Sequence, residues 1–586
     1  MERANSYRTH TCGELRIEDV GKNVILSGWV NSIRKLGGIT FLTLRDNYGI
    51  TQILFKDEEK VSKICRESVV KICGKVLERE SKNNKMETGD IEVLADEIEV
   101  LGKCEPTLPF EISEGTNTKE DLRLKYRYLD LRNPTLHSAI LLRSKVLNFV
   151  RNQMIGLGFN EFQTPILTSS SPEGARDFLV PSRLNPGKFY ALPQSPQIFK
   201  QLLMISGFDK YFQIAPCFRD EDARADRSPG EFYQMDMEMS FAGQEDVFYV
   251  LEQVLYSTFK EFAPNKEITP PPFERINFSD AIRDYCSDKP DLRNPLKVTD
   301  VTDLFSETAF SLFEGKTIKM IIAETGERPR SFYDGLNKFV QSYEGKGLFW
   351  LKNSGGEISG SIAKVLTEKE RKYFEENLKP NQSAFILADT PSRVVTLMGI
   401  FRNKLGQELD LIDKNKFHFC WIVNFPFFEW DEENSSIAFS HNPFSMPQGG
   451  MDALLNKNPL EILAYQYDVV LNGVELASGA VRNHNPEIMV KAFEMAGYDR
   501  SVVENKFPAL FNAFSYGAPP HAGAAFGFDR VIMFLAETEI IRDVIAFPFN
   551  KNAQDLMMGA PNEVSQKQLE EISIKLNVKE KPNEEN

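Results

Sequence analysis

The first hundred residues alternate short apolar and β-branched stretches with polar turns, a pattern typical of a small all-β domain. Five stretches are predicted to be strands, at residues 23–30, 39–46, 50–55, 69–80 and 90–101. Residues 57–68, between the third and fourth stretches, could form a helix. Five strands and one helix predict a Greek-key barrel of the OB type over residues 1–105. A simple β-sandwich is the alternative.

One strand of this barrel carries a candidate binding residue. The pleat of residues 39–46 places Leu42 and Leu44 on one face and Phe41 on the other. If the leucines face the core, Phe41 lies on the surface near Arg34, which belongs to the preceding loop. An exposed aromatic beside cations is typical of a platform on which single-stranded bases stack. A packing role for Phe41 at the barrel rim explains the pattern equally well.

The next part of the chain is predicted to contain a hinge, a helix and a strand. Prolines and a basic-aromatic run mark residues 106–135 as the hinge. Residues 136–159 have helical periodicity and end at glycines. The apolar positions of this helix are Leu141, Val146, Phe149 and Val150. Residues 160–168 are predicted to form a strand, and Pro165 favours a position at a sheet edge or an interface.

The pattern changes between residues 288 and 413, where strand-like and helical stretches alternate. Because the segments rich in polar motifs resume after this part, we expect it to be an inserted α+β domain. Residues 561–586 form a C-terminal extension whose last stretch, VKEKPNEEN, is predicted to be a solvated tail.

Two strand-like stretches flank the charged sequence RDEDARADRSPG. Paired antiparallel, they separate an apolar face from a polar face. The apolar face is predicted to hold Phe212, Ile214, Pro216, Phe218, Met235, Met237, Met239 and Phe241. The polar face is predicted to hold Gln213, Arg219, Gln234, Asp236 and Glu238. Mixed charge on a loop is usually only solvated, but such ordered alternation is typical of a binding surface.

Composition narrows the class of protein without deciding its function. The formal net charge of −15 over 586 residues argues weakly against a protein that coats nucleic acid, and it allows a local basic path. No apolar run reaches the ~18 residues that span a bilayer, and the start lacks the apolar core of a signal peptide. Seven cysteines without a CxxC pair predict reduced thiols and a cytoplasmic protein. The six histidines form no pattern typical of a zinc site.

Several motifs together resemble a known family. The FRDED loop between its two strands resembles the second signature motif of class II aminoacyl-tRNA synthetases. The sequence GFNEFQTPILT is similar to their first motif, and GAAFGFDRVIMFL is similar to their third. The sequences SSPEGARDFLVPSR and ALPQSPQIFKQLLM are closely similar to bacterial aspartyl-tRNA synthetases. This resemblance covers nearly the whole chain.

The resemblance implies a multidomain α+β fold. Its parts would be an N-terminal OB-type barrel that binds the anticodon, a catalytic domain built on an antiparallel sheet, and the inserted α+β domain. The catalytic domain would consist of residues 136–287 and 414–560. The implied reaction joins L-aspartate to tRNA(Asp) through an aspartyl adenylate, with ATP as a substrate.

Adenylate formation develops negative charge on the α-phosphate, which a fixed guanidinium can stabilise. The resemblance implies catalytic roles for Arg219, Glu475 and Arg530. The residues that it implies for ATP binding are Arg219, Asp220, Glu221, Ser228, Glu475, Gly527, Phe528, Asp529 and Arg530. The sequence RSPGEF has one more residue than the usual family pattern, which affects the position of Ser228.

A second hairpin is predicted at Asn472-Gly473, a pair that favours a type I′ turn. This turn sets Val470 opposite Glu475, so Asp468 and Glu475 share one face. On their own, two such carboxylates are more often only solvated. The resemblance implies that they bind Mg²⁺, which prefers oxygen ligands.

The pocket for aspartate requires cations for its side-chain carboxylate. The resemblance implies that Glu173, Gln197, Lys200, Arg219, Asp236, His441 and Arg482 bind aspartate. Simple pleating does not place Arg482 on the face of Glu475, so a bulge near Gly479 is predicted. Ala477 and Ser478 stand where many members of the family have glycines.

The partners implied by the resemblance are tRNA(Asp) and a second copy of the chain, with Pro165 near the dimer interface. The anticodon-binding residues would be Arg34, Phe41, Gln52 and Glu92. Leu36 favours an enzyme strict for tRNA(Asp), and an enzyme that also charges tRNA(Asn) is the alternative. Lys200 and Arg482 disfavour the related asparaginyl and lysyl enzymes. A noncatalytic RNA-binding paralogue is disfavoured by Arg219, Glu475 and Arg530.

Overall fold

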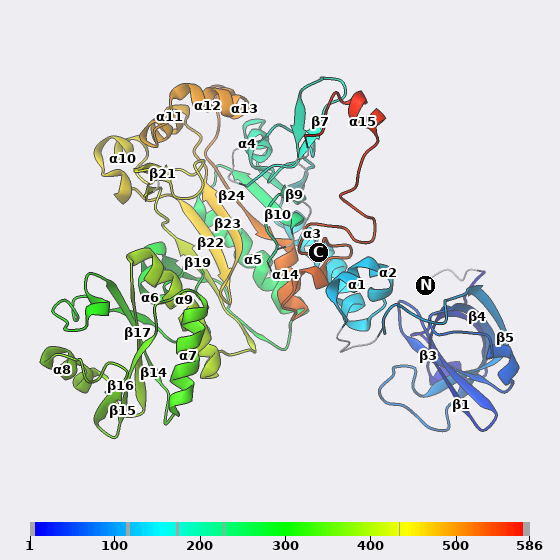
Figure 1. The fold of residues 1–586 in the computed structure, drawn as a ribbon. Coiled ribbons are helices and arrows are strands. Elements are labelled where there is room, and N and C mark those ends of the chain that lie inside the picture. Colours follow the sequence, from blue (N-terminus) through cyan, green and yellow to red (C-terminus); the bar gives the residue numbers. More distant parts are fainter. Residues whose placement is uncertain are drawn as a thin grey trace. The chain divides into compact units, whose positions relative to one another are not determined.

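The computed structural model describes residues 6–112, 118–170, 175–224, 227, 229–432 and 434–577. The chain forms two compact units, Met1–Ile112 and Ser113–Asn586 (Figure 1). The division falls inside the stretch that was predicted to be a hinge.

The first unit is a closed five-stranded barrel with the strand order β1-β2-β3-β5-β4. Its strands are β1 (Asn23–Leu36), β2 (Ile39–Arg45), β3 (Ile50–Phe55), β4 (Val69–Glu78) and β5 (Ile91–Gly102). All five coincide with predicted strands. The OB-type barrel is therefore confirmed, and the alternative sandwich is wrong.

Two local predictions for this unit are wrong. Residues 57–68 hold only a short 3₁₀ turn, Glu58–Val61. The amides of Ser62 and Ile64 donate to carbonyls three positions back, and Glu67 has a positive φ of 64°, which an α-helix does not allow. Arg34 does not lie in a loop, because β1 extends to Leu36 and pairs Arg34 with Phe41 of β2. Leu42 and Leu44 are fully buried, and Phe41 lies half-buried on the outer face, as the alternation predicted.

The second unit is built on an eight-stranded sheet with the order β12-β19-β22-β23-β24-β10-β9-β6 (Figure 1). Its strands are β12 (Glu274–Asn277), β19 (Phe419–Val423), β22 (Gln466–Leu471), β23 (Val474–Val481), β24 (His521–Gly527), β10 (Gly230–Ser240), β9 (Lys210–Arg219) and β6 (Asn160–Glu161). Neighbours are antiparallel except at the two edges, where β12 and β6 run parallel to their neighbours. The predicted antiparallel sheet is confirmed.

The strand predicted for residues 160–168 is much shorter than expected. Asn160–Glu161 forms an edge strand, as Pro165 suggested, and Thr168 makes only an isolated antiparallel bridge with Ala191. The amide of Thr164 donates to the side-chain Oε1 of Gln213 at 3.1 Å instead of to a strand carbonyl. Pro165 has no amide hydrogen to donate, so the ladder with β9 does not resume after Thr164.

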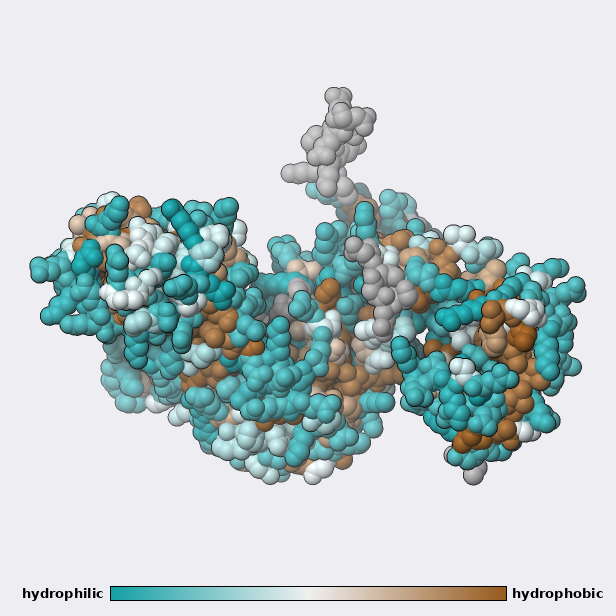
Figure 2. Space-filling view, turned by 90° about the horizontal axis from the view of Figure 1, so that it is seen from below, coloured by the Kyte–Doolittle hydropathy of each residue, from teal (hydrophilic) through white to brown (hydrophobic). Residues whose placement is uncertain are grey.

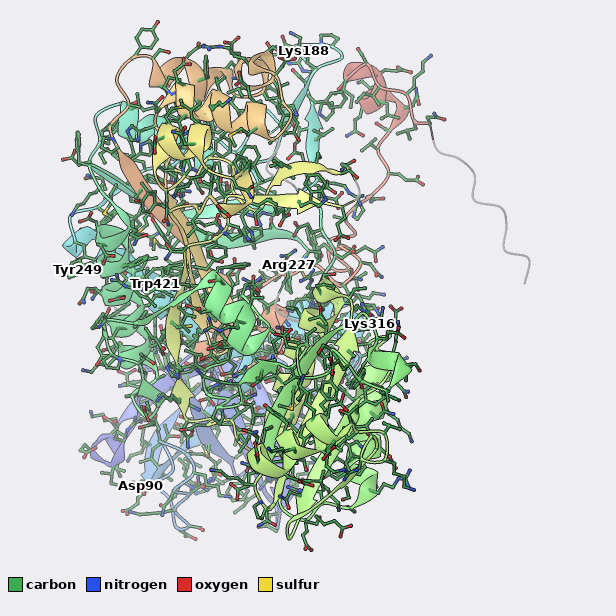
Figure 3. All side chains as sticks on the ribbon, turned by 90° about the vertical axis from the view of Figure 1, so that its left-hand side faces the viewer. Asp90, Lys188, Arg227, Tyr249, Lys316 and Trp421 are labelled. Carbon is green, nitrogen blue, oxygen red and sulfur yellow. The ribbon has the colours of Figure 1, made fainter. Side chains whose placement is uncertain are left out.

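Three helices cover the apolar face of the sheet: α3 (Pro134–Gly156), α5 (Gln244–Phe262) and α14 (Phe528–Leu535). The side chains of Met235, Met237 and Met239 lie in this core, as predicted. Trp421 stacks on Phe248 of α5 with ring centroids 4.0 Å apart. Figure 3 labels Trp421.

Two residues predicted to be apolar contacts are instead exposed. Leu141 lies on the outer side of α3, because the buried side of this helix is defined by Val146, Val150 and Met154. Phe241 is 74% exposed, because it follows the end of β10 with a positive φ of 56° that turns its side chain out of the sheet.

The basic-aromatic part of the predicted hinge is folded as two short helices, α1 (Glu120–Lys125) and α2 (Arg127–Asp130). Arg127 is buried and pairs with Asp130 at 2.6 Å. Its guanidinium also donates to the backbone carbonyls of Arg542, Ile545 and Ala546. This segment is therefore an integral part of the second unit.

The predicted insertion contains a separate five-stranded sheet of order β13-β14-β17-β15-β16. Its strands are β13 (Val298–Asp300), β14 (Thr317–Glu324), β15 (Phe349–Ser354), β16 (Glu357–Gly360) and β17 (Gln382–Asp389). Helices α7 (Arg330–Ser342) and α9 (Pro391–Glu408) pack on one face, and α8 (Glu368–Asn377) packs on the other. The predicted α+β character is confirmed.

Shorter elements complete the second unit. They are β7 (Leu179–Pro181), β8 (Phe189–Ala191), α4 (Gln197–Ile205), β11 (Glu267–Ile268), α6 (Phe278–Tyr285), β18 (Lys416–Phe417), β20 (Phe428–Asp431), β21 (Ser436–Phe439), α10 (Gly450–Asn456), α11 (Pro486–Met495), α12 (Arg500–Lys506), α13 (Pro508–Phe514) and α15 (Gln566–Glu571). The last nine residues, VKEKPNEEN, lie outside the described residues.

Figure 2 shows a mostly hydrophilic surface on which hydrophobic residues form separate patches. Among the described residues, no helix combines the length and apolar character needed to cross a membrane. All seven cysteines lie in the described part of the chain and are free thiols, as their number and spacing predicted.

Candidate functional site

Two neighbouring cavities lie on the polar face of the eight-stranded sheet. The first is lined by residues that include Glu221, Lys289, Glu475, Gly527, Asp529 and Arg530. The second is lined by residues that include Gln197, Lys200, Asp236, His441, Asn442 and Arg482. Four residues line both cavities, namely Arg219, Gln234, Ser478 and Ala525. The two cavities therefore meet at the end of β9.

Arg219 lies at this junction. It is the last residue of β9 and pairs with Gly230, where β10 begins. Its guanidinium lies 5.0 Å from the ring centroid of Phe232, and its Nε donates to the carbonyl of Gln194 at 3.4 Å. A guanidinium keeps its charge at any physiological pH. A permanent cation is thus held where the two cavities join.

The floor of the second cavity is a network of four buried charges. Lys200 Nζ lies 2.6 Å from Asp236 Oδ1 and 3.4 Å from Glu238 Oε2. Arg482 donates from Nε and Nη2 to the two carboxylate oxygens of Glu238, at 3.0 and 3.3 Å. None of the four side chains is more than 3% exposed. Lys200 and Arg482 therefore line the cavity, and the carboxylates of Asp236 and Glu238 neutralise their charges.

The charges in this network shift each other's pKa values. Burial alone raises the pKa of Glu238, but Arg482 and Lys200 outweigh burial and hold this pKa below its usual value. Burial raises the pKa of Asp236 even though Lys200 opposes the shift. Glu238 is therefore the firmly ionised carboxylate that links both cations.

The sheet makes room for Glu238 by means of a glycine. A Cβ atom on Gly523 would lie 2.1 Å from Glu238 Oε2 and 2.2 Å from the carbonyl of Met237. Both distances are far shorter than a van der Waals contact, so only glycine fits at this position of β24. The glycine-rich third motif thus has a packing reason in addition to any contact with a ligand.

A chain of buried amides and a histidine supports Gln197. Gln197 Nε2 donates to Gln201 Oε1 at 3.0 Å, and Gln201 Nε2 lies 3.0 Å from His521 Nε2. His521 is fully buried, and its Nδ1 lies 2.8 Å from the carbonyl of Pro519. Burial lowers the pKa of His521, so the neutral ring can accept from Gln201 and donate to Pro519.

The β22–β23 hairpin forms one side of the first cavity. Asn472 and Gly473 have φ values of 51° and 86°, which confirms the predicted turn. Val470 lies opposite Glu475, also as predicted. A bulge in β23 changes which face the residues after it lie on, as predicted. Its predicted position near Gly479 is wrong. The register shifts directly after Glu475, just before Ala477, where the regular pairing of β23 with β24 begins, so this pairing contains no bulge at Gly479.

Asp468 and Glu475 are both near this bulge. Asp468 is buried, and its Oδ1 has no hydrogen-bond partner among the described residues. Burial and the charge of Glu475 raise the pKa of Asp468 well above its usual value. A divalent cation would relieve both effects, so the two carboxylates fit a magnesium site.

Two cations contact Glu475 from different sides. Lys289 Nζ lies 3.0 Å from Glu475 Oε2, and Arg530 Nη1 donates to the backbone carbonyl of Glu475 at 2.6 Å. Arg530 lies in the first turn of α14, directly after β24. The first cavity therefore brings together Glu475 and Arg530, which were predicted, and Lys289, which was not.

The other candidates for ATP binding have different surroundings. Asp529 is buried, forms an ion pair with Arg143 and accepts from the amide of Tyr233 at 3.1 Å. The side chain of Phe528 lies in the hydrophobic core, so only its backbone is available to a ligand.

The FRDED loop contributes two lining residues, Arg219 and Glu221, whereas its Asp220 and Asp222 are exposed. Glu221 lines the first cavity and forms an ion pair with Arg227. Of these two residues, Figure 3 labels Arg227. Asp220 is exposed and is not among the lining residues of either cavity in the described part of the chain. Glu173 and Ser228 lie outside the described residues.

The four anticodon-binding candidates come from four strands of the barrel. Phe41 of β2 lies between Arg34 of β1 and Leu54 of β3. Gln52 Nε2 of β3 donates to Glu92 Oε2 of β5 at 2.7 Å. The barrel thus carries an aromatic ring, a cation and a hydrogen-bonded amide–carboxylate pair on its outer face.

Sequence reasoning missed three residues that shape these cavities. The alternation of polar and apolar residues correctly predicted that Glu238 lies on the polar face. It did not predict that Glu238 links two cations. Arg143 of α3 pairs with Asp529, and the helical periodicity of its segment gave no sign of this contact. Lys289 lies in a loop after α6 and carries no local pattern that could have identified it.

Comparisons with known proteins agree with this geometry. Residues 119–551 match the family of tRNA synthetases class II (D, K and N). Residues 24–101 match the OB-fold nucleic acid binding domain. A crystal structure of a putative aspartyl-tRNA synthetase from Leishmania major Friedlin has a TM-score of 0.59 at 21% identity and covers 94% of this chain and 95% of that chain. This likeness shows the fold.

Sequence relatives are much more similar. The aspartate–tRNA(Asp/Asn) ligase of Zymomonas mobilis is 53% identical and covers 98% of this chain and 99% of its own length. The aspartate–tRNA ligase of Streptomyces coelicolor is 53% identical, with 97% and 98% covered. The expected family is confirmed, and the chain belongs to the class II tRNA synthetases of the D, K and N group.

Proposed function

We propose that the protein is an aspartate–tRNA ligase. It would activate L-aspartate with ATP to aspartyl adenylate and then transfer the aspartyl group to the 3′ end of tRNA(Asp). The observation that carries this proposal is the position of Arg219, which lines both cavities. Two relatives at 53% identity are named as ligases of aspartate, which supports the choice of amino acid.

The two cavities suit the two substrates of the first step. ATP would lie in the first cavity and aspartate in the second, so that the α-carboxylate of aspartate faces the α-phosphate beside Arg219. Attack by a carboxylate oxygen forms the acyl–phosphate bond, and the bond to pyrophosphate breaks. Arg219 would stabilise the charge that develops on the α-phosphate, and Arg530 would bind the far end of ATP.

Selectivity for aspartate would come from Lys200 and Arg482. Each cation is fixed by Glu238 and still lines the second cavity. The side-chain carboxylate of aspartate can pair with them, whereas the amide of asparagine would leave buried donors and charge uncompensated. Glu173 and Gln197 would bind the α-amino end, and His441 would close over the substrate.

Magnesium would be held by Asp468 and Glu475 together with the phosphates of ATP. This ion typically uses one or two carboxylates and takes its other ligands from phosphate and water. When bound, it would neutralise charge on the phosphates.

The test of the proposed function is aspartate-dependent exchange between pyrophosphate and ATP. Among all the amino acids, we expect aspartate alone to support rapid exchange. Arg219→Ala should lower the rate by ~10²-fold or more, because it removes one transition-state donor. Arg283→Ala is a matched control, because Arg283 is exposed and pairs only with its helix neighbours Asp280 and Asp284 among the described residues.

Either of two results would reject the proposal. One is exchange that depends on a different amino acid, and the other is a folded Arg219→Ala variant that exchanges at the normal rate.

The tRNA specificity is proposed to be strict. The relatives differ in this respect, since some are named as ligases for tRNA(Asp) and others as ligases for both tRNA(Asp) and tRNA(Asn). Leu36 ends β1 and is 71% exposed, and its apolar side chain offers no hydrogen bond to a second anticodon base. Purified tRNA(Asn) should be charged more than ~10-fold less efficiently than tRNA(Asp), a gap of at least ~1.4 kcal/mol. A smaller gap would favour the relaxed enzyme.

Two further properties complete the proposal. The chain would act as a homodimer, because Ile166 and Leu167 expose apolar side chains beside the edge strand β6. A ligase that supplies translation with charged tRNA would act in the cytoplasm.

A further inference from the structure

The loop that leads into the inserted domain reaches the first cavity. Lys289 lies in this loop, between α6 and β13. Its Nζ lies 3.0 Å from Glu475 Oε2 and 3.7 Å from Asp288 Oδ2. The side chain remains partly exposed and lines the same cavity as Arg219 and Arg530.

A buried arginine fixes the segment that follows Lys289. Arg402 of α9 is 1% exposed. Its guanidinium donates to the carbonyls of Asp291 at 3.1 Å, Asn294 at 2.5 Å and Leu296 at 2.6 Å. The side chain of Asn294 donates back to the carbonyl of Arg402 at 2.9 Å. The loop is thus tied to the inserted domain by several buried hydrogen bonds.

The same loop packs on the tip of the β22–β23 hairpin. A Cβ atom on Gly473 would lie 3.2 Å from the Cβ of Asp291, so the turn and the loop are in close contact. Lys289 is two positions before Asp291, and Glu475 is two positions after Gly473. This contact fixes the backbone around both members of the ion pair, so the ammonium group is held at the cavity wall.

The chemistry of the cavity suggests what this lysine binds. Arg530 and Lys289 contact the same residue, Glu475, through its backbone and its side chain respectively. A nucleotide whose phosphates reach Arg530 therefore lies close to the Lys289 ammonium group. Adenylate formation releases pyrophosphate, whose charge rises as the bond to the α-phosphate breaks, and an ammonium group stabilises such charge.

We propose that Lys289 binds the β- and γ-phosphates of ATP and the pyrophosphate product, and exchanges its ion pair with Glu475 for these phosphates when magnesium occupies the carboxylate. This inference rests on the proposed function. It gives the inserted domain a direct part in nucleotide binding, because Arg402 and the 291–296 segment position Lys289.

The test compares ligands with and without the two outer phosphates. Dissociation constants of the full-length Lys289→Ala variant are measured by calorimetry for Mg·ATP, for Mg·pyrophosphate and for a stable sulfamoyl analogue of aspartyl adenylate. We expect both phosphate ligands to bind about 10-fold more weakly or worse, as the loss of a charge-assisted hydrogen bond predicts. Binding of the adenylate analogue should change less than about 2-fold, because it lacks the β- and γ-phosphates.

Two further variants control this experiment. Lys289→Arg keeps the charge and should restore most of the affinity for Mg·ATP. Lys297→Ala removes a nearby exposed lysine that pairs with Asp284 at 3.4 Å, and it should bind all three ligands normally.

The outcomes separate this inference from the proposed function. Unchanged binding of Mg·ATP and Mg·pyrophosphate by Lys289→Ala would overturn the inference. So would an equal loss for the adenylate analogue, since it would mean that Lys289 only shapes the site. The proposed function fails separately if the wild-type chain exchanges pyrophosphate with an amino acid other than aspartate, or with none.

Discussion

At the scale of residues, the positions of the two cations in the second cavity depend on the carboxylate of Glu238, which does not itself line the cavity. Glu238 is fully buried and binds both Lys200 and Arg482. A buried ion pair adds little net stability by itself, but removal of one member leaves uncompensated charge in a medium of low dielectric constant. Glu238 therefore matters both for stability and for the position of the two cations.

We expect Glu238→Gln to lower the free energy of unfolding by about 3–5 kcal/mol near neutral pH. The pKa of Glu238 is lower in the folded than in the unfolded chain. Its ionised form therefore stabilises the protein above the usual glutamate pKa of about 4.3, and this contribution is lost as the pH falls through the folded-state value. Unfolding of the intact chain in urea over a range of pH measures both effects.

The control for this prediction is Glu245→Gln. Glu245 forms an exposed pair with Arg275 at 2.5 Å, and such surface pairs contribute less than about 1 kcal/mol. Equal losses in the two variants, or a loss for Glu238→Gln that does not shrink at low pH, would contradict the role assigned to Glu238.

At the scale of elements, short-range geometry places each candidate residue on its surface. The Asn472-Gly473 turn sets the register of β22 against β23, and the bulge after Glu475 brings Ser478 to the polar face. In the barrel, pairing of β1, β2 and β3 brings Arg34, Phe41 and Leu54 side by side. Strand register therefore fixes the positions of side chains on the outer face of the barrel, as it does on the floor of the cavities.

Phe41→Ala should weaken recognition of tRNA(Asp) by roughly 1–3 kcal/mol, as the loss of one stacked base does. Exchange of pyrophosphate should be unchanged, because the barrel is a compact unit separate from the one that holds both cavities. Aminoacylation kinetics at varied tRNA concentration and the exchange assay give the two readouts.

Leu101→Ala serves as the matched barrel variant, because Leu101 is also partly exposed but lies outside the anticodon-binding candidates. If Phe41→Ala reduced exchange and charging equally, it would be acting through misfolding, and the stacking role would be rejected.

At the scale of the whole molecule, the candidate binding residues are distributed over two compact units. The barrel carries the candidates for anticodon reading, and the second unit carries both cavities and the inserted domain. The second unit also exposes apolar side chains next to β6, where Ile166 is 48% and Leu167 is 52% exposed. An apolar edge of this kind is a candidate for contact with a second copy of the chain.

We expect sedimentation to give the mass of two chains. Leu167→Glu should shift the protein towards single chains and lower its activity, because a charge would be buried at the interface. Leu455→Glu changes a similarly exposed leucine on α10 and should leave the dimer intact. A fully active wild-type monomer would show that the edge of the sheet has another role.

Much of the fold could be read from local patterns in the sequence. The alternation of Leu42 and Leu44, the methionines of β10 and the Asn472-Gly473 turn each predicted the correct face or turn, because these features depend on neighbours one to four positions away. The motifs around Arg219 and Arg530 predicted the family for a similar reason, since each is a continuous stretch of chain.

Only the tertiary structure decided how these stretches combine. Arg482 and Glu238 are 244 positions apart, and the loop of Lys289 reaches Glu475 across the inserted domain, so no periodicity could connect them. The exposed Leu141 follows from which side of α3 the folded core covers. Local sequence preferences determine which way a side chain points, whereas long-range packing determines which residues it contacts. The binding chemistry of this protein depends on these long-range contacts.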